Sequence, residues 1–173
     1  MNNKIDLYRA DFGGSIFELI HKKWMLITAG TEDNCNTMTA SWGGLGVLWN
    51  RNVSTIYVRP ERYTYEFIER EGYYTVSFFG DEYRDVLTKC GTVSGREVDK
   101  ISECGLTVKK SETGGIYFDQ AELVLVCRKL YHQDLDLSGM TAIDPDNYYG
   151  EHGGVHRMYI GEIVETLGSA DTK

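Results

Sequence analysis

The stretch NTMTASWGGLGVLW, residues 36–49, says most about the fold. Successive side chains of a β-strand point to opposite faces, so hydroxyl side chains at alternate positions can share one face. The glycine cluster after Trp42 predicts that the strand breaks where a backbone or a ligand approaches closely. Such a set suits a polar, planar ligand, and a solvent-facing stripe is the alternative interpretation. The residues are Thr37, Thr39 and Ser41 on one face, with Asn36, Met38 and Trp42 on the other face or at the strand ends.

Outward from this stretch, short apolar runs bounded by glycine, proline or polar residues predict six or seven strands. Segments with helical spacing lie between them, and we expect Asp81 to cap one helix, Gly91 to end it, and Val98 and Ile101 of the next to face inward. The expected strands cover residues 24–30, 38–49, 53–59, 73–79, 106–110, 116–135 and 156–167, and the expected helices or turns cover 15–23, 61–72, 81–91 and 95–105.

This order of elements favours a closed or nearly closed barrel over a doubly wound sheet, because no βαβ spacing repeats. We therefore expect a mainly β fold with short helices, in a single domain over residues 1–173. The run Gly44-Leu45-Gly46 has no third glycine at the spacing of a dinucleotide-binding fingerprint. Phosphate-binding P-loops and hydrolase nucleophile elbows are also missing from the sequence.

Composition limits the partners. A net charge of −8 opposes binding to nucleic acid or to an anionic membrane surface, since both need clustered cations. The first twenty residues carry acidic side chains where a signal peptide would be apolar, and no run approaches 18 apolar residues, so we expect a cytoplasmic protein. The four cysteines form no CxxC pair and no Cys/His cluster, so we expect reduced thiols and no metal site.

Positive charge gathers in the segment GTVSGREVDK, residues 91–100, which adds Arg96 and Lys100 to a flexible loop with hydroxyls. The segment precedes an expected helix start, where backbone N–H groups and cations together can hold a phosphate. Arg59 ends a strand before Pro60 and can add a guanidinium fork. An ordinary solvated turn is the alternative interpretation of the loop.

One histidine stands at the start of an apolar strand. His156 opens the segment HRMYIGEI, where a neutral imidazole can hydrogen-bond a ligand, and a structural histidine is the alternative. His152 lies four residues earlier among glycines and competes for the same role.

Taken in order, five segments from about Trp24 to Ile163 resemble the flavin reductase-like family, and more closely its flavoredoxin-like branch. The segments are NTMTASWGGLGVLW, VRPERYTYEFIE, YYTVSFF, CGTVSGREVDKISECGL and HRMYIGEI. The resemblance implies a split β-barrel homodimer with FMN held near the dimer interface. It also implies a cofactor site, which we expect at Asn36, Thr37, Met38, Thr39, Ser41, Trp42, Arg59, Thr64, Ser94, Gly95, Arg96 and Lys100, with His156 as the catalytic candidate.

Three functions remain open at this point. The leading hypothesis is an NAD(P)H-dependent flavin oxidoreductase, in which a hydride passes from the nicotinamide to flavin N5. The second is an FMN electron-transfer protein that a partner reduces. The third is a split-barrel binding protein that takes haem or no cofactor. The sequence does not separate NADH from NADPH as the electron donor.

Overall fold

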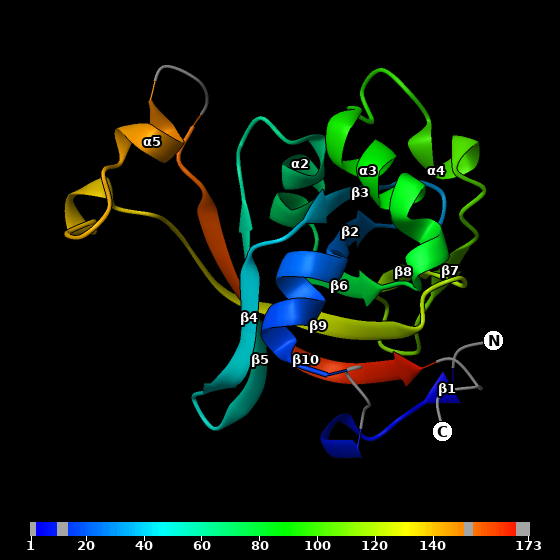
Figure 1. Cartoon of the computed structure of the whole chain (residues 1–173). Coiled ribbons are helices and arrows are strands. Elements are labelled where there is room, and N and C mark those ends of the chain that lie inside the picture. Colours follow the sequence, from blue (N-terminus) through cyan, green and yellow to red (C-terminus); the bar gives the residue numbers. More distant parts are fainter. Residues whose placement is uncertain (1–2, 10–13, 151–153, 169–173) are drawn as a thin grey trace.

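The computed structural model describes residues 3–9, 14–150 and 154–168 (Figure 1). Its centre is an eight-stranded antiparallel sheet with the order β3-β2-β6-β9-β10-β5-β4, and β1 pairs with the end of β10. The strands of this sheet are β1 (Asn3–Lys4), β2 (Met25–Gly30), β3 (Cys35–Ala40), β4 (Gly43–Leu48), β5 (Arg51–Val58), β6 (Tyr73–Phe78), β9 (Leu123–Asp134) and β10 (Arg157–Gly168).

The sheet curls into a barrel that is split between β3 and β4. These strands stand at opposite ends of the strand order, yet β3 ends at Ala40 and β4 begins at Gly43. Only Ser41 and Trp42 separate them in the chain, so the sheet must curve until its two edges meet at this link. The polar stretch singled out in the sequence therefore lies at the split.

Both faces of the sheet are buried along β2, which explains its continuous apolar sequence. Met25 and Ile27 belong to a core cluster that includes Phe67 and Tyr159. Leu26, between them, points to a second cluster on the other face. Residues of α3 and of the small β7–β8 sheet complete that second cluster.

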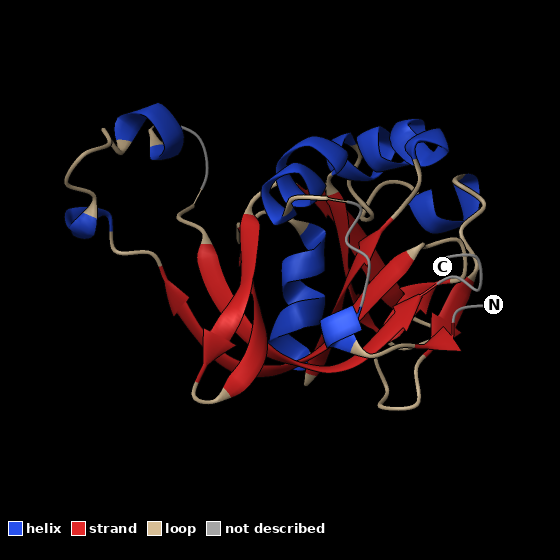
Figure 2. Ribbon diagram, turned by 60° about the horizontal axis from the view of Figure 1, so that its bottom comes forward, coloured by secondary structure: helices blue, strands red, loops and turns tan. Residues whose placement is uncertain are grey.

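Short helices pack around the barrel rather than forming a layer across it (Figure 2). Contacts from α2 and α3 fall mainly on β2 and β3. The remaining elements are η1 (Leu7–Arg9), α1 (Ile16–Glu18), η2 (Leu19–Lys23), α2 (Tyr63–Arg70), η3 (Asp81–Tyr83), α3 (Arg84–Thr92), α4 (Lys100–Glu103), β7 (Val108–Lys110), β8 (Ile116–Phe118), η4 (Leu137–Gly139) and α5 (Asp146–Tyr149).

Two helix boundaries differ from the sequence expectation. Asp81 is not an N-cap but the first residue of η3, and Gly91 lies inside α3 rather than at its end. A Cβ at Gly91 would lie 3.3 Å from the Thr39 side chain, so this glycine serves the close packing of α3 on β3. The next helix is also shorter than expected: α4 begins only at Lys100, because the Asp99 side chain caps it by accepting from the Ser102 amide.

A long excursion joins β9 to β10. Residues 135–150 and 154–156, here called the arm, include η4 and α5, which lie away from the barrel (Figures 1 and 2). The arm returns to the barrel at His156, next to the start of β10. Within the described residues, no helix is long and apolar enough to cross a membrane.

Candidate functional site

Two adjoining pockets open at the split of the barrel. The mouth pocket, of about 370 Å³, is lined by Met38, Thr39, Ala40, Ser41, Trp42, Tyr57, Arg59, Arg62 and His156. The inner pocket, of about 100 Å³, is lined by Asn36, Met38, Glu61, Arg62, Tyr63, Thr64, Thr92, Val93, Ser94, Gly95 and Lys100. Met38 and Arg62 line both, so the two pockets form one groove along β3. Most of the candidate residues found in the sequence meet in this groove.

The mouth pocket is aromatic on one side. The ring centroids of Trp42 and His156 lie 5.1 Å apart. The Nδ1 atom of His156 lies 3.0 Å from the Tyr149 hydroxyl of the arm. Burial, and then the nearby Arg59 charge, lower the pKa of His156 to about 4 against the opposing effect of Glu61. The imidazole is therefore neutral at physiological pH and can serve the pocket as a hydrogen-bond donor or acceptor.

Two cations that have no carboxylate partner among the described residues line the inner pocket. Lys100 is only 3% exposed, and its Nζ donates to the carbonyl oxygens of Cys90 and Val93 at 3.1 Å each. The Arg62 guanidinium, half-buried, donates to the Gly91 carbonyl at 2.9 Å. Neither forms an ion pair within the described part of the chain. Burial, together with the Arg62 charge, lowers the pKa of Lys100 to about 8.

Arg62 was missed in the sequence, where Arg59 was chosen from the same segment. The Arg59 guanidinium donates to the Tyr148 carbonyl and lies 5.4 Å from the Tyr149 ring centroid, so it faces the arm. Arg62 instead precedes α2 and points back to α3. The choice between two arginines three residues apart depends on where the chain turns after Pro60, which composition does not show.

The wall of the inner pocket is set by close contacts. The Asn36 amide nitrogen donates to the Thr64 hydroxyl at 2.7 Å, and both side chains are buried. Gly95 packs so tightly there that a Cβ would lie 2.1 Å from the Asn36 side-chain oxygen. Glycine is thus required at 95 by the approach of the loop to β3. Ser94, whose hydroxyl accepts from the Arg96 amide, completes this wall.

Three predicted side chains are engaged elsewhere. The Thr37 hydroxyl is buried against Thr28 and the Ile27 carbonyl, and it lines neither pocket. Thr39 lines the mouth pocket, but its hydroxyl donates to the Leu87 carbonyl at 2.5 Å. The Arg96 guanidinium pairs with Glu66 and lies over the Tyr63 ring. His152 lies outside the described residues.

Compared with known protein families, residues 17–173 match the flavin reductase like domain. The chain belongs to the flavin reductase-like family. Membership supports a flavin-binding oxidoreductase and confirms the family resemblance seen in the sequence. A search of curated proteins finds no match.

Solved structures of flavin reductase-like proteins share the fold. Flavoredoxin from Methanosarcina acetivorans has a TM-score of 0.68 at 21% identity, over 86% of this chain and 69% of that one. An FMN-binding protein from Thermus thermophilus has a TM-score of 0.68 at 19% identity, over 96% and 83%. An NADH:FAD oxidoreductase from Streptomyces globisporus has a TM-score of 0.61 at 15% identity, over 84% and 74%. The expected mainly β, split-barrel fold is thus confirmed.

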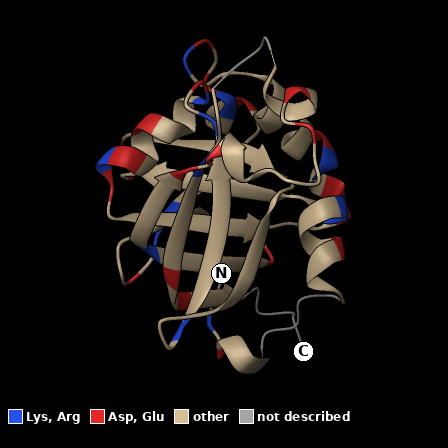
Figure 3. Cartoon of the chain, turned by 90° about the vertical axis from the view of Figure 1, so that its left-hand side faces the viewer, with Lys and Arg blue, Asp and Glu red and all other residues tan. Residues whose placement is uncertain are grey.

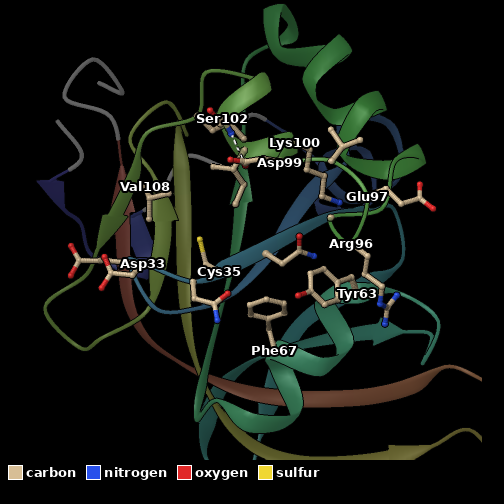
Figure 4. A pocket seen from close by; sticks show the side chains of 17 residues that line it. Asp33, Cys35, Tyr63, Phe67, Arg96, Glu97, Asp99, Lys100, Ser102 and Val108 are labelled. Atoms are coloured by element: carbon tan, nitrogen blue, oxygen red, sulfur yellow. Dashed lines mark hydrogen bonds between the residues drawn. The ribbon is translucent and has the colours of Figure 1, made fainter.

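This flavin reductase-like chain has a larger hollow beside the inner pocket. The acidic cleft, of about 560 Å³, shares Asn36, Tyr63, Gly95 and Lys100 with the inner pocket. Figure 4 shows Tyr63 and Phe67 at its base. Four carboxylates also line it, from Glu32, Asp33, Glu97 and Asp99. Among the described residues, no group of side chains has the composition of a metal site. In the acidic cleft the four carboxylates outnumber the two cations, Arg96 and Lys100, whereas the inner pocket has Arg62 and Lys100 against Glu61 alone. The inner pocket is therefore the better place for a phosphate.

Proposed function

We propose that this protein binds FMN and catalyses NAD(P)H-dependent flavin reduction, with the phosphate in the inner pocket and the ring system in the mouth pocket. The observation that carries the proposal is the pair Lys100 and Arg62, a buried ammonium and a half-buried guanidinium without a carboxylate partner in the described chain. Buried charges are costly unless they are paired. A phosphate would neutralise both cations.

Further donors support the phosphate end. Ser94 and Thr64 bring hydroxyls to the inner pocket, and the 94–95 loop brings backbone N–H groups. The sequence placed these N–H groups at a helix start, but α4 begins later and carries its own cap, so the loop itself would supply them. Arg96 would have to leave Glu66 to reach the pocket. We therefore assign the phosphate chiefly to Lys100 and Arg62.

The mouth pocket suits the ring system. Trp42 and His156 offer flat apolar surfaces and a ring nitrogen, while Ser41 offers a hydroxyl near the end of β3. When bound there, FMN would accept a hydride equivalent from NADH or NADPH. The chain's own residues would position the ring system and would supply hydrogen bonds, and no strong protein acid or base is needed. The remaining proposed contacts are Asn36, Met38, Thr39 and Arg59.

We also propose that the protein works as a homodimer in the cytoplasm. The outer edge of β4 has no partner strand in the described chain, and its tip carries Val47 and Trp49, which are 74% and 57% exposed. At Gly44 and Gly46 an added Cβ would meet nothing within 4 Å. An apolar edge with room for a close approach fits a second copy of the same edge.

The decisive experiment is a visible spectrum of purified protein reconstituted with FMN, followed by anaerobic addition of NADH and then NADPH. A bound-flavin spectrum that bleaches with either nucleotide supports the reductase. A bound-flavin spectrum that bleaches only with a reduced protein partner would favour the electron carrier. A protein that ignores FMN would contradict the proposal and leave a haem-binding or cofactor-free barrel to be tested.

A further inference from the structure

Tyr149 reaches the proposed site from outside the barrel. It ends α5 in the arm, and its hydroxyl lies 3.0 Å from His156 Nδ1. The two rings meet edge to face, with centroids 5.6 Å apart and an interplanar angle of 74°. No other hydrogen bond of the Tyr149 hydroxyl is found among the described residues, which favours donation of its proton to Nδ1.

The arm holds Tyr149 in place through contacts that do not use its hydroxyl. Arg59 donates to the Tyr148 carbonyl, and the Gly154 amide donates to the Glu61 carboxylate. The Tyr148 ring packs edge-on against Trp42 at a centroid distance of 6.1 Å. Loss of the Tyr149 hydroxyl alone should therefore leave the arm where it is.

We propose that Tyr149 is a positioning residue that fixes His156 as the tautomer protonated at Nε2. A hydroxyl that donates to Nδ1 leaves the ring proton of a neutral imidazole on Nε2, at the opposite edge of the ring. His156 lines the mouth pocket. The proposal places its Nε2–H there, so that a ligand meets a donor rather than a lone pair. The inference rests on the proposed function, because the donor matters only if a ligand carbonyl meets it.

The chemical consequence follows from hydrogen-bond complementarity. Flavin rings and nicotinamide carboxamides both carry carbonyl oxygens, which accept hydrogen bonds from an N–H group. The other tautomer would turn a nitrogen lone pair toward the same oxygen, which costs a hydrogen bond and adds repulsion. Tyr149 thus decides which of two neutral forms of His156 the site presents.

The test compares Tyr149→Phe with Tyr148→Phe, which removes the neighbouring hydroxyl from an exposed ring that packs on Trp42 rather than on His156. The first readout is the ¹⁵N NMR spectrum of His156 in flavin-free protein. We expect Nε2–H in the wild type and in Tyr148→Phe, and a mixture of tautomers in Tyr149→Phe. An unchanged Nε2–H signal in Tyr149→Phe would overturn the proposal, whether or not FMN binds.

The second readout is anaerobic stopped-flow reduction of FMN-loaded protein. We expect Tyr149→Phe to slow reduction about tenfold at saturating NAD(P)H, with FMN affinity within about twofold of the wild type. In a His156→Gln background the same substitution should change the rate little, because the group it positions is gone. A full tenfold loss in that background would mean that Tyr149 acts independently of His156. If FMN does not bind, the proposed function is wrong. The NMR spectrum of flavin-free protein still tests whether Tyr149 fixes the tautomer of His156.

Discussion

At the scale of single residues, the side chains of the inner pocket give the most specific indication of the ligand. Arg62 and Lys100 converge on it without a carboxylate partner in the described chain, whereas Arg96, which the sequence singled out, is paired with Glu66. A charged side chain that already has a partner gains little from a new anion. The contrast between Arg62 and Arg96 therefore provides a matched pair of substitutions.

We expect Arg62→Ala to weaken FMN binding about tenfold to a hundredfold, the loss of one charge-assisted contact of about 1.5–3 kcal/mol. Arg96→Ala should weaken it less, and neither should change riboflavin binding much, since riboflavin lacks the phosphate. Isothermal titration with FMN and riboflavin measures all four affinities. Equal losses for both ligands in Arg62→Ala would show that Arg62 supports the pocket's shape rather than the phosphate.

The lowered pKa of Lys100 gives a pH dependence. Burial lowers its pKa from the ordinary lysine value of 10.5 to about 8 in the folded chain. The ammonium therefore loses its proton above pH 8, and the ligand-free protein then no longer has a charge buried at Lys100. A bound phosphate favours the charged form, so FMN binding above pH 8 must take up a proton. We expect FMN affinity to fall as pH rises from 8 to 10, by up to tenfold per unit.

Riboflavin titrated over the same range is the control for ionisation of the ring, and Lys100→Met is the control for the lysine itself. The fall with pH should be absent from Lys100→Met. If that variant keeps the full pH dependence, another group is responsible and Lys100 does not contact the phosphate.

At the scale of elements, the sequence predicted the positions of strands better than it predicted the directions in which side chains point. Apolar runs marked β2, β5, β6, β9 and β10, because a buried strand must be apolar on whichever faces are covered. Two expected strands were wrong in their bounds: residues 38–49 are the end of β3 and the whole of β4, and residues 116–135 contain β8 and β9, which belong to different sheets. The two misjudged helices each depended on one side chain: Asp99 caps α4 late, and Gly91 is a packing glycine inside α3. Where such helices begin and end depends on the side chains and backbone that each residue contacts in the fold, and the local sequence does not contain that information.

The same limit applies to the candidate site. Alternation put Thr37 with Thr39, but the strand is covered on both sides, so its hydroxyl is satisfied inside the sheet at Thr28. Tyr149 left no signal, since it lies seven residues before His156 in an irregular arm. The segments that build the groove could be predicted, whereas the partner of each polar atom could not.

The loop between α3 and α4 provides a prediction at this scale. We expect Gly95→Ala to disrupt the inner pocket, because its Cβ would lie 2.1 Å from the Asn36 oxygen and 3.1 Å from the Tyr63 ring. The loop must then retreat from β3, and FMN affinity should fall at least tenfold. Gly105→Ala, where a Cβ would meet nothing within 4 Å, is a control for the backbone, since its positive φ of 63° makes it strained but distant. Fluorescence titration with FMN would measure both, and an unaffected Gly95→Ala would place the phosphate elsewhere.

At the scale of the whole molecule, charge and apolar surface lie in different places. Figure 3 shows strands with few charged residues, while most Lys, Arg, Asp and Glu lie on helices and loops around them. The β4 sequence, GGLGVL, contains no charge at all. Its hairpin turn holds Trp49 at a φ of 51°, uncommon for a bulky residue, and the ring packs on Tyr131. The exposed apolar tip is therefore held in a defined position.

We expect this edge to make the protein a dimer of twice its 19.6 kDa chain mass, and Val47→Glu to make it a monomer, because a carboxylate would be buried where two apolar edges meet. Ile143→Glu is the control: Ile143 is also exposed, at 53%, but lies on the arm and should leave the dimer intact. Light scattering after size exclusion gives both masses.

Trp42 precedes β4 directly and is 44% exposed in the single chain, so a partner at the β4 edge would also cover the mouth pocket. The Val47→Glu monomer should therefore lose FMN affinity as well, and a monomer that binds FMN as tightly as the wild type would separate the flavin site from the interface.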